Sequence, residues 1–436
     1  MQQATQTIAA ATPAHQSDER ERLLAGFREV RGRSQILAEP LSPEDMTAQS
    51  MADASPAKWH LAHTTWFFET FILRDYQPGY RAFHPAYNFL FNSYYESVGE
   101  RHARPRRGLL TRPSAAEVLD YRRHVDTALE ALVIEAPVDA WLQLAPLLEL
   151  GLHHEMQHQE LLLTDVLHLL AQNPLSPAYR DAPLQSGSSA PPLTWWDHDG
   201  GLVEIGHDGA GFAYDCEGPR HSVFLQPFAL ASRPVSNGDW LAFMADGGYE
   251  NANLWLSDAW ATVQSEGWRA PLYWEEEAAD GLWTAMTLLG RRQVDPQAPV
   301  CHVSLFEADA YARWAGARLP KEAELEVAVV GLPVAGNLLG SDVLMPQAGT
   351  GTVDRPDQLY GDVWEWTQSA YGPYPGFRAP EGAVGEYNGK FMCSQFVLRG
   401  GSCVTPDAQL RPSYRNFFYP HQRWQFTGLR LAKDRS

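Results

Sequence analysis

The segment that most constrains the fold is residues 137–171, a leucine-rich stretch whose apolar side chains recur at helical spacing. A helix with so long an apolar stripe is stable in water only when other helices cover it. The same period recurs over residues 17–33, 57–75 and 114–133. These segments predict that residues 17–172 form an all-α domain, a small four-helix bundle.

A short motif after the first of these segments predicts one more helix start. In LSPEDM, Ser42 is a suitable N-cap, Pro43 fits the first helical position and acidic residues occupy the first turn. We therefore expect a helix to begin at Ser42.

The pattern changes after residue 172. Residues 173–192, NPLSPAYRDAPLQSGSSAPP, are interrupted every few positions by Pro, Ser or Gly, which is typical of a linker. Residues 193–434 consist of short apolar or aromatic runs separated by turns, and they predict an irregular α+β domain with long ordered loops. Only residues 306–329 look strongly helical, and Pro320 divides them into two helices.

Composition argues against several classes of protein. The net charge of -19, from 34 Lys and Arg against 53 Asp and Glu, opposes binding to nucleic acid or to anionic membranes. The sequence shows neither a secretory signal nor a long apolar segment, so we expect a cytoplasmic protein. The four cysteines form no CxxC pair, and reduced thiols are expected rather than disulfides or a thiolate metal site.

The run LHHEMQHQE, residues 152–160, holds three of the 15 histidines. Residues four apart lie on one face of a helix, about 6 Å from each other, so His154 and His158 can bind one cation. Their stripe also carries leucines and should face the bundle interior, whereas His153 points about 100° away. About 0.5 such pairs would arise by chance, so a core pair without a metal is the simpler alternative. Burying imidazoles without partners is costly, which favours a site.

A third ligand has to come from another helix. The segment WHLAHTTWFFE offers His63, which shares a face with Trp59 and Trp66, and His60, which is the less suitable alternative. Three neutral imidazoles leave open coordination positions, which suits either a catalytic zinc or an iron that binds substrate and dioxygen. Spacing alone does not choose between these metals.

Longer stretches around these histidines resemble a known family. WHLAHTTWFFET, FNSYYESVGERHARPRRGLLTRP and HHEMQHQELLLTDVLH resemble the DinB-like N-terminal domain of the ergothioneine-biosynthesis sulfoxide synthases. The second half, through AYARWAGARLPKEAELEVA, LYGDVWEWTQSAY and VLRGGSC, is similar to their formylglycine-generating-enzyme (FGE)-sulfatase domain, which has a C-type-lectin-like fold. The resemblance covers roughly residues 20–434 and implies a multidomain protein, with a DinB-like four-helix bundle followed by an α+β domain.

The resemblance implies an oxidoreductase with a mononuclear nonhaem Fe(II), held by His63, His154 and His158, and with O2 as co-substrate. The implied reaction joins the thiol of cysteine, or of γ-glutamylcysteine, to C2 of the imidazole of N-α-trimethylhistidine (hercynine) and leaves a sulfoxide. A C–S bond at an unactivated carbon requires a strong oxidant, and an iron with open positions can hold the reactants together.

Tyr94 and Tyr95, in FNSYYESVG, are the candidate catalytic acids. A phenol with a pKa near 10 can donate a proton and steer the reaction away from simple oxidation of the thiol. Tyrosine pairs are more often packing residues, and the catalytic role is what the resemblance implies. The YY pair resembles the branch of the family in which the tyrosine comes from the bundle and the donor is cysteine.

Five further residues are candidate substrate contacts. The resemblance implies that Gln157, Asn416 and Phe417 bind hercynine, whose trimethylammonium group is held best by aromatic faces. Without it, a solvent-exposed glutamine and an aromatic core cluster would be the simpler interpretations. A guanidinium is the natural partner of the donor's carboxylate, and within RHARPRRGLLTRP we favour Arg104 and Arg107 over a solvated basic loop.

The second domain also departs from the enzymes that it resembles. FGE enzymes bind copper through a close cysteine pair near RGGS, but RGGSCVTPDAQLRPSYRN contains only Cys403, which we interpret as a structural thiol. Copper-dependent formylglycine formation is therefore disfavoured. The acidic residues Glu322, Glu326, Asp362 and Glu365 are expected to form scaffold ion pairs and turn hydrogen bonds rather than an acid/base pair.

Three alternatives stay open at this point. A selenoneine-type synthase would prefer a selenosugar donor, and a DinB-type metal-dependent thiol S-transferase that uses zinc would need no oxygen. A noncatalytic binding module would keep its partner after loss of the histidines.

Overall fold

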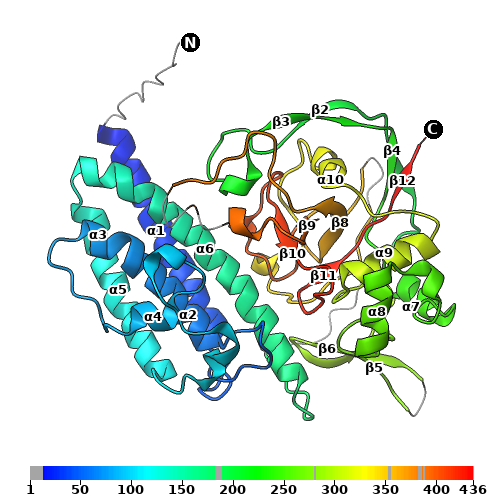
Figure 1. The fold of residues 1–436 in the computed structure, drawn as a ribbon, viewed down its shortest axis with the longest axis horizontal. Coiled ribbons are helices and arrows are strands. Elements are labelled where there is room, and N and C mark those ends of the chain that lie inside the picture. The colour runs from blue at the N-terminus through cyan, green and yellow to red at the C-terminus, as the bar shows by residue number, and fades with distance from the viewer. Residues whose placement is uncertain are drawn as a thin grey trace.

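The computed structural model describes residues 13–181, 189–278, 281–351, 355–381, 385 and 388–435. A helical domain and a mixed domain lie side by side, and the long helix α6 (Val138–Ala171) runs along the boundary between them (Figure 1). Residues 182–188 of the predicted linker lie outside the described residues. No helix in these ranges is both long and apolar enough to cross a lipid bilayer.

The helical domain begins with α1 and ends with α6, and α2 packs against both α5 and α6. The long helices of the domain are α1 (Pro13–Ala38), α2 (Ala57–Phe68), α5 (Ala115–Glu135) and α6. The shorter segments are a π-helical turn η1 (Glu69–Leu73), α3 (Arg74–Tyr76), α4 (Tyr87–Phe91) and the 3-10 turns η2 (Glu96–Val98) and η3 (Arg104–Leu109). The predicted four-helix bundle is therefore confirmed.

The mixed domain consists of small sheets flanked by helices and 3-10 turns. Its strands are β1 (Trp195–His198), β2 (Gly201–Ile205), β3 (His221–Leu225), β4 (Phe228–Ala231), β5 (Trp274–Glu276), β6 (Trp283–Thr287), β7 (Gly290–Gln293), β8 (Trp364–Ala370), β9 (Phe396–Arg399), β10 (Asn416–Phe418), β11 (Thr427–Gly428) and β12 (Ala432–Asp434). Its helices are α7 (Asn237–Ala245), α8 (Ser257–Glu266), α9 (Leu305–Trp314) and α10 (Glu322–Ala328). Its 3-10 turns are η4 (Asp215–Glu217), η5 (Ala252–Leu254), η6 (Leu339–Ser341), η8 (Gly389–Phe391) and η9 (Asp407–Gln409).

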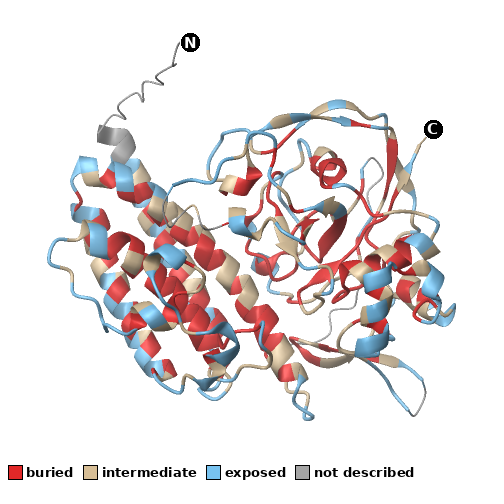
Figure 2. Ribbon diagram, viewed as in Figure 1, coloured by how far each residue is buried: buried red, intermediate tan, exposed pale blue. Residues whose placement is uncertain are grey.

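The strands form separate sheets with the orders β1-β4-β12, β10-β9-β8-β11, β2-β3 and β5-β6-β7. In the second of these sheets, β10 and β9 are antiparallel with Phe417 opposite Val397, and β11 is parallel to β8. Buried residues fill both the interior of the bundle and the centre of the mixed domain (Figure 2).

A glycine allows α6 to approach α2 closely. A Cβ added at Gly151 would lie 2.3 Å from Cε1 of Phe68, a distance that real Cβ atoms essentially never show, and 3.1 Å from Cε1 of Phe67, which is tighter than most real Cβ contacts. The contact between these helices therefore depends on the absence of a side chain at residue 151. One turn later on α6 comes His154, so this contact also sets how near the histidines of the two helices come.

A buried ion network ties three helices of the bundle together. Glu155 of α6 accepts hydrogen bonds from Arg31 of α1 at 2.8 Å and from Arg122 of α5 at 2.9 Å. Burial opposes ionisation of Glu155, but the two guanidinium groups outweigh it and hold the pKa of this carboxyl at about 2. The network is adjacent to His154 and fixes the backbone there.

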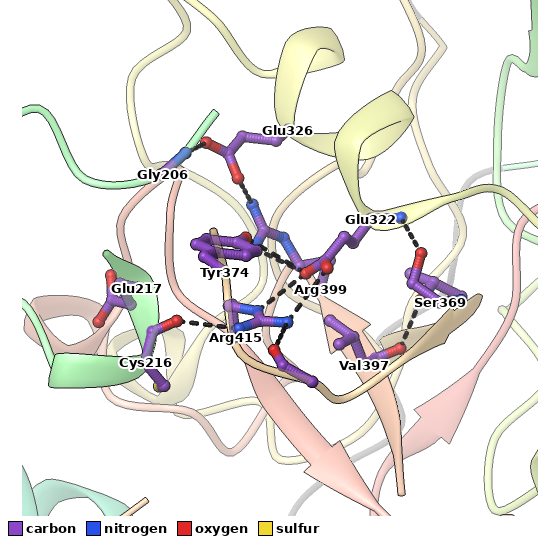
Figure 3. Close-up of polar contacts among 12 residues, drawn as sticks. Gly206, Cys216, Glu217, Glu322, Glu326, Ser369, Tyr374, Val397, Arg399 and Arg415 are labelled. Carbon is purple, nitrogen blue, oxygen red and sulfur yellow. Dashed lines mark hydrogen bonds and ion pairs between the residues drawn. The ribbon is translucent and has the colours of Figure 1, made fainter. Parts of the chain in front are cut away.

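The carboxylates of the mixed domain also serve as ion-pair partners. Glu326 pairs with Arg399 at 2.5 Å and accepts from the backbone N–H of Gly206 at 2.6 Å, while Glu322 pairs with Arg415 at 2.9 Å (Figure 3). In the same way, Glu365 pairs with the buried Arg430 at 2.8 Å, and Asp362 accepts hydrogen bonds from Asn337 and Gln358. These contacts agree with the interpretation of all four acids as scaffold residues.

Two sequence-based expectations about helices differ from the structure. Ser42 and Asp45 exchange capping hydrogen bonds at 3.0 and 3.1 Å, but they close only a turn, so the expected helix start at Ser42 is wrong. The following residues carry no periodic apolar stripe, and a cap alone does not stabilise a helix. The expectation that only residues 306–329 of the second domain are strongly helical is also wrong, because α7 and α8 precede them.

Candidate metal centre

Three imidazole side chains from two helices converge inside the bundle. His63 comes from α2, and His154 and His158 come from successive turns of α6. One ring nitrogen from each lies within 4.8 Å of the others, and the ring centroids are 4.7 to 4.9 Å apart. The i,i+4 spacing on α6 and the close approach at Gly151 bring the three histidines together.

Electrostatics keeps these imidazoles neutral. Burial lowers the pKa of His63 and His158 well below the ordinary value, and the neighbouring histidines lower it further. Burial also lowers the pKa of His154 to about 3. At neutral pH each ring therefore presents an uncharged nitrogen with a lone pair, the form that binds a metal ion.

The hydrogen bonds around His63 leave one of its nitrogens for a ligand. Its Nδ1 donates to the backbone carbonyl of Phe91 at 2.6 Å, so the lone pair resides on Nε2. This Nε2 atom is buried and has no hydrogen-bond partner among the residues that the structure describes. A buried acceptor of this kind is costly unless something binds it, and a metal ion meets that requirement. The donor set, three neutral imidazoles, fits a first-row transition metal with open coordination positions.

His60, the alternative third ligand in the sequence, lies behind the cluster. Its Nδ1 is 2.8 Å from Nδ1 of His158, and its Nε2 is 3.0 Å from Oδ2 of Asp165. Both ring nitrogens are thus engaged away from the centre of the cluster. The structure therefore favours His63 as the third ligand.

An aromatic and cationic layer covers the α2 side of the cluster. The indole of Trp59 stacks on the His63 ring at 4.6 Å, and the Arg107 guanidinium lies 3.3 Å above the indole. Arg107 is buried and donates to the hydroxyls of Ser55 at 2.8 Å and Ser93 at 3.3 Å. Burial, followed by the nearby Arg104, lowers the pKa of Arg107 well below its usual value, so this cation would be stabilised by an anion.

The candidate tyrosines lie next to each other in the loop before η2. Tyr95 is fully buried, with its ring 5.6 Å from Trp66 and 5.1 Å from Phe71. Tyr94 is half-buried and stacks on Tyr95 at 4.6 Å. The ring of Phe391, from the mixed domain, packs edge-to-face with the ring of Tyr94, and the two centroids are 5.3 Å apart. The tyrosine pair therefore reaches from the bundle to the domain boundary.

The outward face of α6 binds the mixed domain within the same turns that carry His154 and His158. His153 stacks on Phe212 at 3.8 Å and is 2.9 Å from Oε1 of Gln409, while Gln157 donates to the Tyr414 hydroxyl at 2.9 Å. The predicted substrate contact Gln157 thus already has one partner from the other domain.

Glu160 of α6 also contacts the mixed domain, and it was not identified from the sequence. The Trp364 indole donates to its carboxylate at 2.5 Å. Burial raises the pKa of Glu160 to about 7, although hydrogen bonds with Trp364, Thr405 and Ser402 restrain the rise. A glutamate in a predicted amphipathic helix normally faces solvent, so nothing in the sequence distinguished this residue.

The other predicted substrate residues are in two places. Asn416 and Phe417 open β10, where the Phe417 ring stacks on Tyr371 at 3.9 Å and the Asn416 side-chain oxygen accepts from the Phe417 N–H at 2.9 Å. The preceding Arg415, which also donates to the Cys216 carbonyl at 2.9 Å, anchors this strand (Figure 3). Arg104 is exposed and donates to the backbone carbonyl of Asp53, so it lies farther out than the buried Arg107.

Comparisons with known proteins agree with this two-domain arrangement. Residues 26–162 match the DinB superfamily, and residues 198–341 and 357–435 match the sulfatase-modifying factor enzyme 1-like domain. The chain is 32% identical over 405 residues to a hercynine oxygenase of Mycobacterium tuberculosis, covering 87% of this chain and 91% of that protein. It is 34% identical over 414 residues to the hercynine oxygenase of Mycolicibacterium smegmatis, with the same coverage.

The chain belongs to the hercynine oxygenase family. Membership confirms the predicted resemblance, the predicted fold class and the prediction of an oxidoreductase enzyme. The mixed domain has its own similarity to other proteins of the same fold: a formylglycine-generating enzyme of Streptomyces coelicolor is 28% identical over 281 residues, covering 52% of this chain and 84% of that enzyme. In this member of the hercynine oxygenase family, Cys403 is buried and free, as are Cys216 and Cys301.

Proposed function

We propose that this chain is an iron(II)- and dioxygen-dependent sulfoxide synthase that joins the cysteine thiol to C2 of the hercynine imidazole. The observation that carries the proposal is the cluster of three neutral histidines, two of them buried and one half-buried, in a chain whose relatives are hercynine oxygenases. The stoichiometry balances. Forming the C–S bond removes two electrons from the two substrates, and oxidising the sulfur removes two more. Dioxygen accepts all four electrons: one of its oxygen atoms becomes the sulfoxide oxygen, and the other takes up the two hydrogens and leaves as water.

His63, His154 and His158 would hold the iron. Bound there, iron(II) would supply the redox chemistry that activates dioxygen, which no protein side chain provides. The remaining work is binding, orientation and proton delivery by the chain itself. His63 and His154 are buried and His158 is half-buried, which limits the access of bulk water and the loss of the oxidant to solvent.

Arg107 is proposed to bind the carboxylate of the thiol donor. The residue is a buried guanidinium stacked on Trp59, which in turn stacks on His63, so an anion bound there lies close to the histidine cluster. Its Nε–H has no acceptor among the described residues, which leaves a donor for a ligand. The exposed Arg104 adds positive charge near Arg107. The resemblance of the Tyr94–Tyr95 pair to the cysteine-using branch supports cysteine over γ-glutamylcysteine as the donor.

Hercynine is proposed to bind where the bundle meets β10. Gln157, held by Tyr414, would contact the substrate imidazole, and the Asn416 amide would donate to the substrate carboxylate. Phe417, stacked on Tyr371, presents an aromatic face to the trimethylammonium group, which has no N–H to donate.

Tyr94 and Tyr95 are proposed to supply the proton that directs turnover to the coupled product. A buried phenol in an aromatic shell stays protonated at neutral pH and can donate without water entering the site. Replacing either tyrosine with Phe removes only the hydroxyl. We expect Tyr94→Phe or Tyr95→Phe to divert turnover towards oxidation of the thiol itself. Wild-type product ratios in both variants would assign the acid role to another group.

The function is tested by aerobic incubation of the Fe(II)-loaded protein with hercynine and either cysteine or γ-glutamylcysteine, followed by mass spectrometry. The expected product is the hercynyl cysteine sulfoxide, formed only with oxygen and lost in His154→Ala. Coupling without oxygen in the zinc-loaded protein would identify a thiol transferase, and preference for a selenosugar would identify a selenoneine-type enzyme. No coupled product under any of these conditions would refute the assignment.

A further inference from the structure

A chain of buried hydrogen bonds lies behind one of the three imidazoles. Nδ1 of His158 faces Nδ1 of His60 at 2.8 Å, and Nε2 of His60 faces Oδ2 of Asp165 at 3.0 Å. The same carboxylate oxygen accepts the backbone N–H of Ser55 at 2.7 Å. His60 and Asp165 are both buried, so water does not compete for these bonds. This chain of hydrogen bonds connects α2 and α6.

The positions of the protons along this chain follow from its end. A carboxylate oxygen only accepts, so Nε2 of His60 carries a hydrogen, and Nδ1 of a neutral His60 is then an acceptor. The facing Nδ1 of His158 must therefore be the donor. The lone pair of His158 consequently lies on Nε2, on the side away from His60, which is the side required of a metal ligand.

We propose that His60 and Asp165 are positioning residues, which fix both the tautomer and the ring orientation of His158 for metal binding. The inference rests on the proposed metal site but not on the identity of the substrates. His63 receives the equivalent support from a backbone carbonyl, that of Phe91. At His158 this support is provided by side chains, so substitution there can remove it without altering a ligand.

Loss of this chain of hydrogen bonds should change the tautomer of His158 in a predictable direction. Without an acceptor at Asp165, His60 gains nothing from keeping its hydrogen on Nε2 and can place it on Nδ1 instead. His158 would then accept on Nδ1 and carry its own hydrogen on Nε2, where a metal has to displace it. Partners of this kind affect metal affinity by about 10- to 100-fold in proteins generally.

The experiment measures Co(II) binding by competition with a chelator, because the absorption bands of Co(II) report its coordination geometry. His60→Phe and Asp165→Leu should weaken Co(II) binding by about 10- to 100-fold. At saturating Co(II) their bands should shift, a change that a merely structural role would not produce. The conservative Asp165→Asn keeps an acceptor oxygen for His60 and Ser55 and should stay within a few fold of wild type.

His168→Phe is the matched control. His168 is one turn further along α6 and bonds to the Ser50 hydroxyl at 2.7 Å, outside the chain. This control should leave both affinity and spectrum unchanged. Far-UV circular dichroism of the metal-free proteins establishes folding, and either His60→Phe or Asp165→Leu suffices if the other does not fold.

The outcomes distinguish failure of the positioning role from failure of the metal site. Wild-type affinity and spectrum in folded His60→Phe and Asp165→Leu would overturn the positioning role while leaving the metal site intact. Failure of wild type to bind Co(II), or undiminished binding by His63→Ala, would overturn the metal site and the positioning role with it. A protein that binds Co(II) as expected but forms no sulfoxide would refute the proposed reaction alone.

Discussion

The buried carboxyl of Glu160 makes a contribution to the stability of this protein that falls as pH rises from acid to neutral. The residue as a whole is half-buried, but its carboxylate meets the Trp364 indole at 2.5 Å between the domains. Its pKa there is about 7 against an ordinary value of 4.5. Between these values the unfolded chain has lost this proton while the folded chain keeps it, so the contribution of Glu160 to the free energy of unfolding falls with rising pH. Above pH 7 both states are ionised and the effect is constant.

The magnitude follows from the size of the shift. At about 1.4 kcal/mol for each pH unit, the free energy of unfolding should lose about 3 kcal/mol between pH 4.5 and 7 through this group. Glu160→Gln keeps the shape and an acceptor for the Trp364 N–H but does not titrate. Relative to wild type, the free energy of unfolding of this variant should therefore increase by about 3 kcal/mol as pH rises from 4.5 to 8.

The assay is urea unfolding of the metal-free proteins, followed by circular dichroism and tryptophan fluorescence at several pH values. The metal-free form is used because metal binding adds its own pH dependence. The control is Glu149→Gln on the same helix, where an exposed pair with Arg22 at 3.1 Å should contribute less than about 1 kcal/mol at any pH. If the difference in free energy of unfolding between Glu160→Gln and wild type stays constant from pH 4.5 to 8, the titration of Glu160 does not contribute as expected.

Two further substitutions test the packing that brings the histidines together. Gly151→Ala should destabilise the bundle by about 1 to 3 kcal/mol through overlap with Phe68, whereas Gly32→Ala, which meets no atom within 4 Å, should be neutral or stabilising. Equal effects of the two in thermal unfolding would contradict the close approach. Arg122→Ala removes one partner of the buried Glu155 and should cost about 3 to 5 kcal/mol, measured by urea unfolding. A loss below 1 kcal/mol would show that this ion pair contributes little.

Local patterns in the sequence were sufficient to predict the bundle and its histidine cluster. The apolar period marked the long helices, and the i,i+4 spacing placed His154 and His158 on one face. The choice of His63 over His60 followed from the aromatic face that His63 shares with Trp59 and Trp66, and both indoles do stack on its ring. These features depend on a few neighbouring residues, which is why sequence reasoning reached them.

Contacts between the domains could not be predicted in this way. Trp364, Gln409 and Tyr414 lie more than 200 residues from their partners on α6, and they reach those partners only after the mixed domain has folded. Helix α7 carried a usable signal, since Ser236 and Asp239 form a capping box, but its short apolar stripe resembles the surrounding loops. In both cases the deciding information is tertiary.

The turns of α6 from residue 153 to 160 present two surfaces, with ligands on one and domain contacts on the other. Inserting or deleting a single residue between His154 and Gln157 would rotate the residues that follow by about 100° relative to those before, so His158 would leave the face of His154 and the domain contacts would no longer share one face. The helix therefore couples the geometry of the histidine cluster to the position of the mixed domain, and a change in one alters the other. We would therefore expect length changes to be tolerated in the loops of the mixed domain long before they are tolerated in this part of α6.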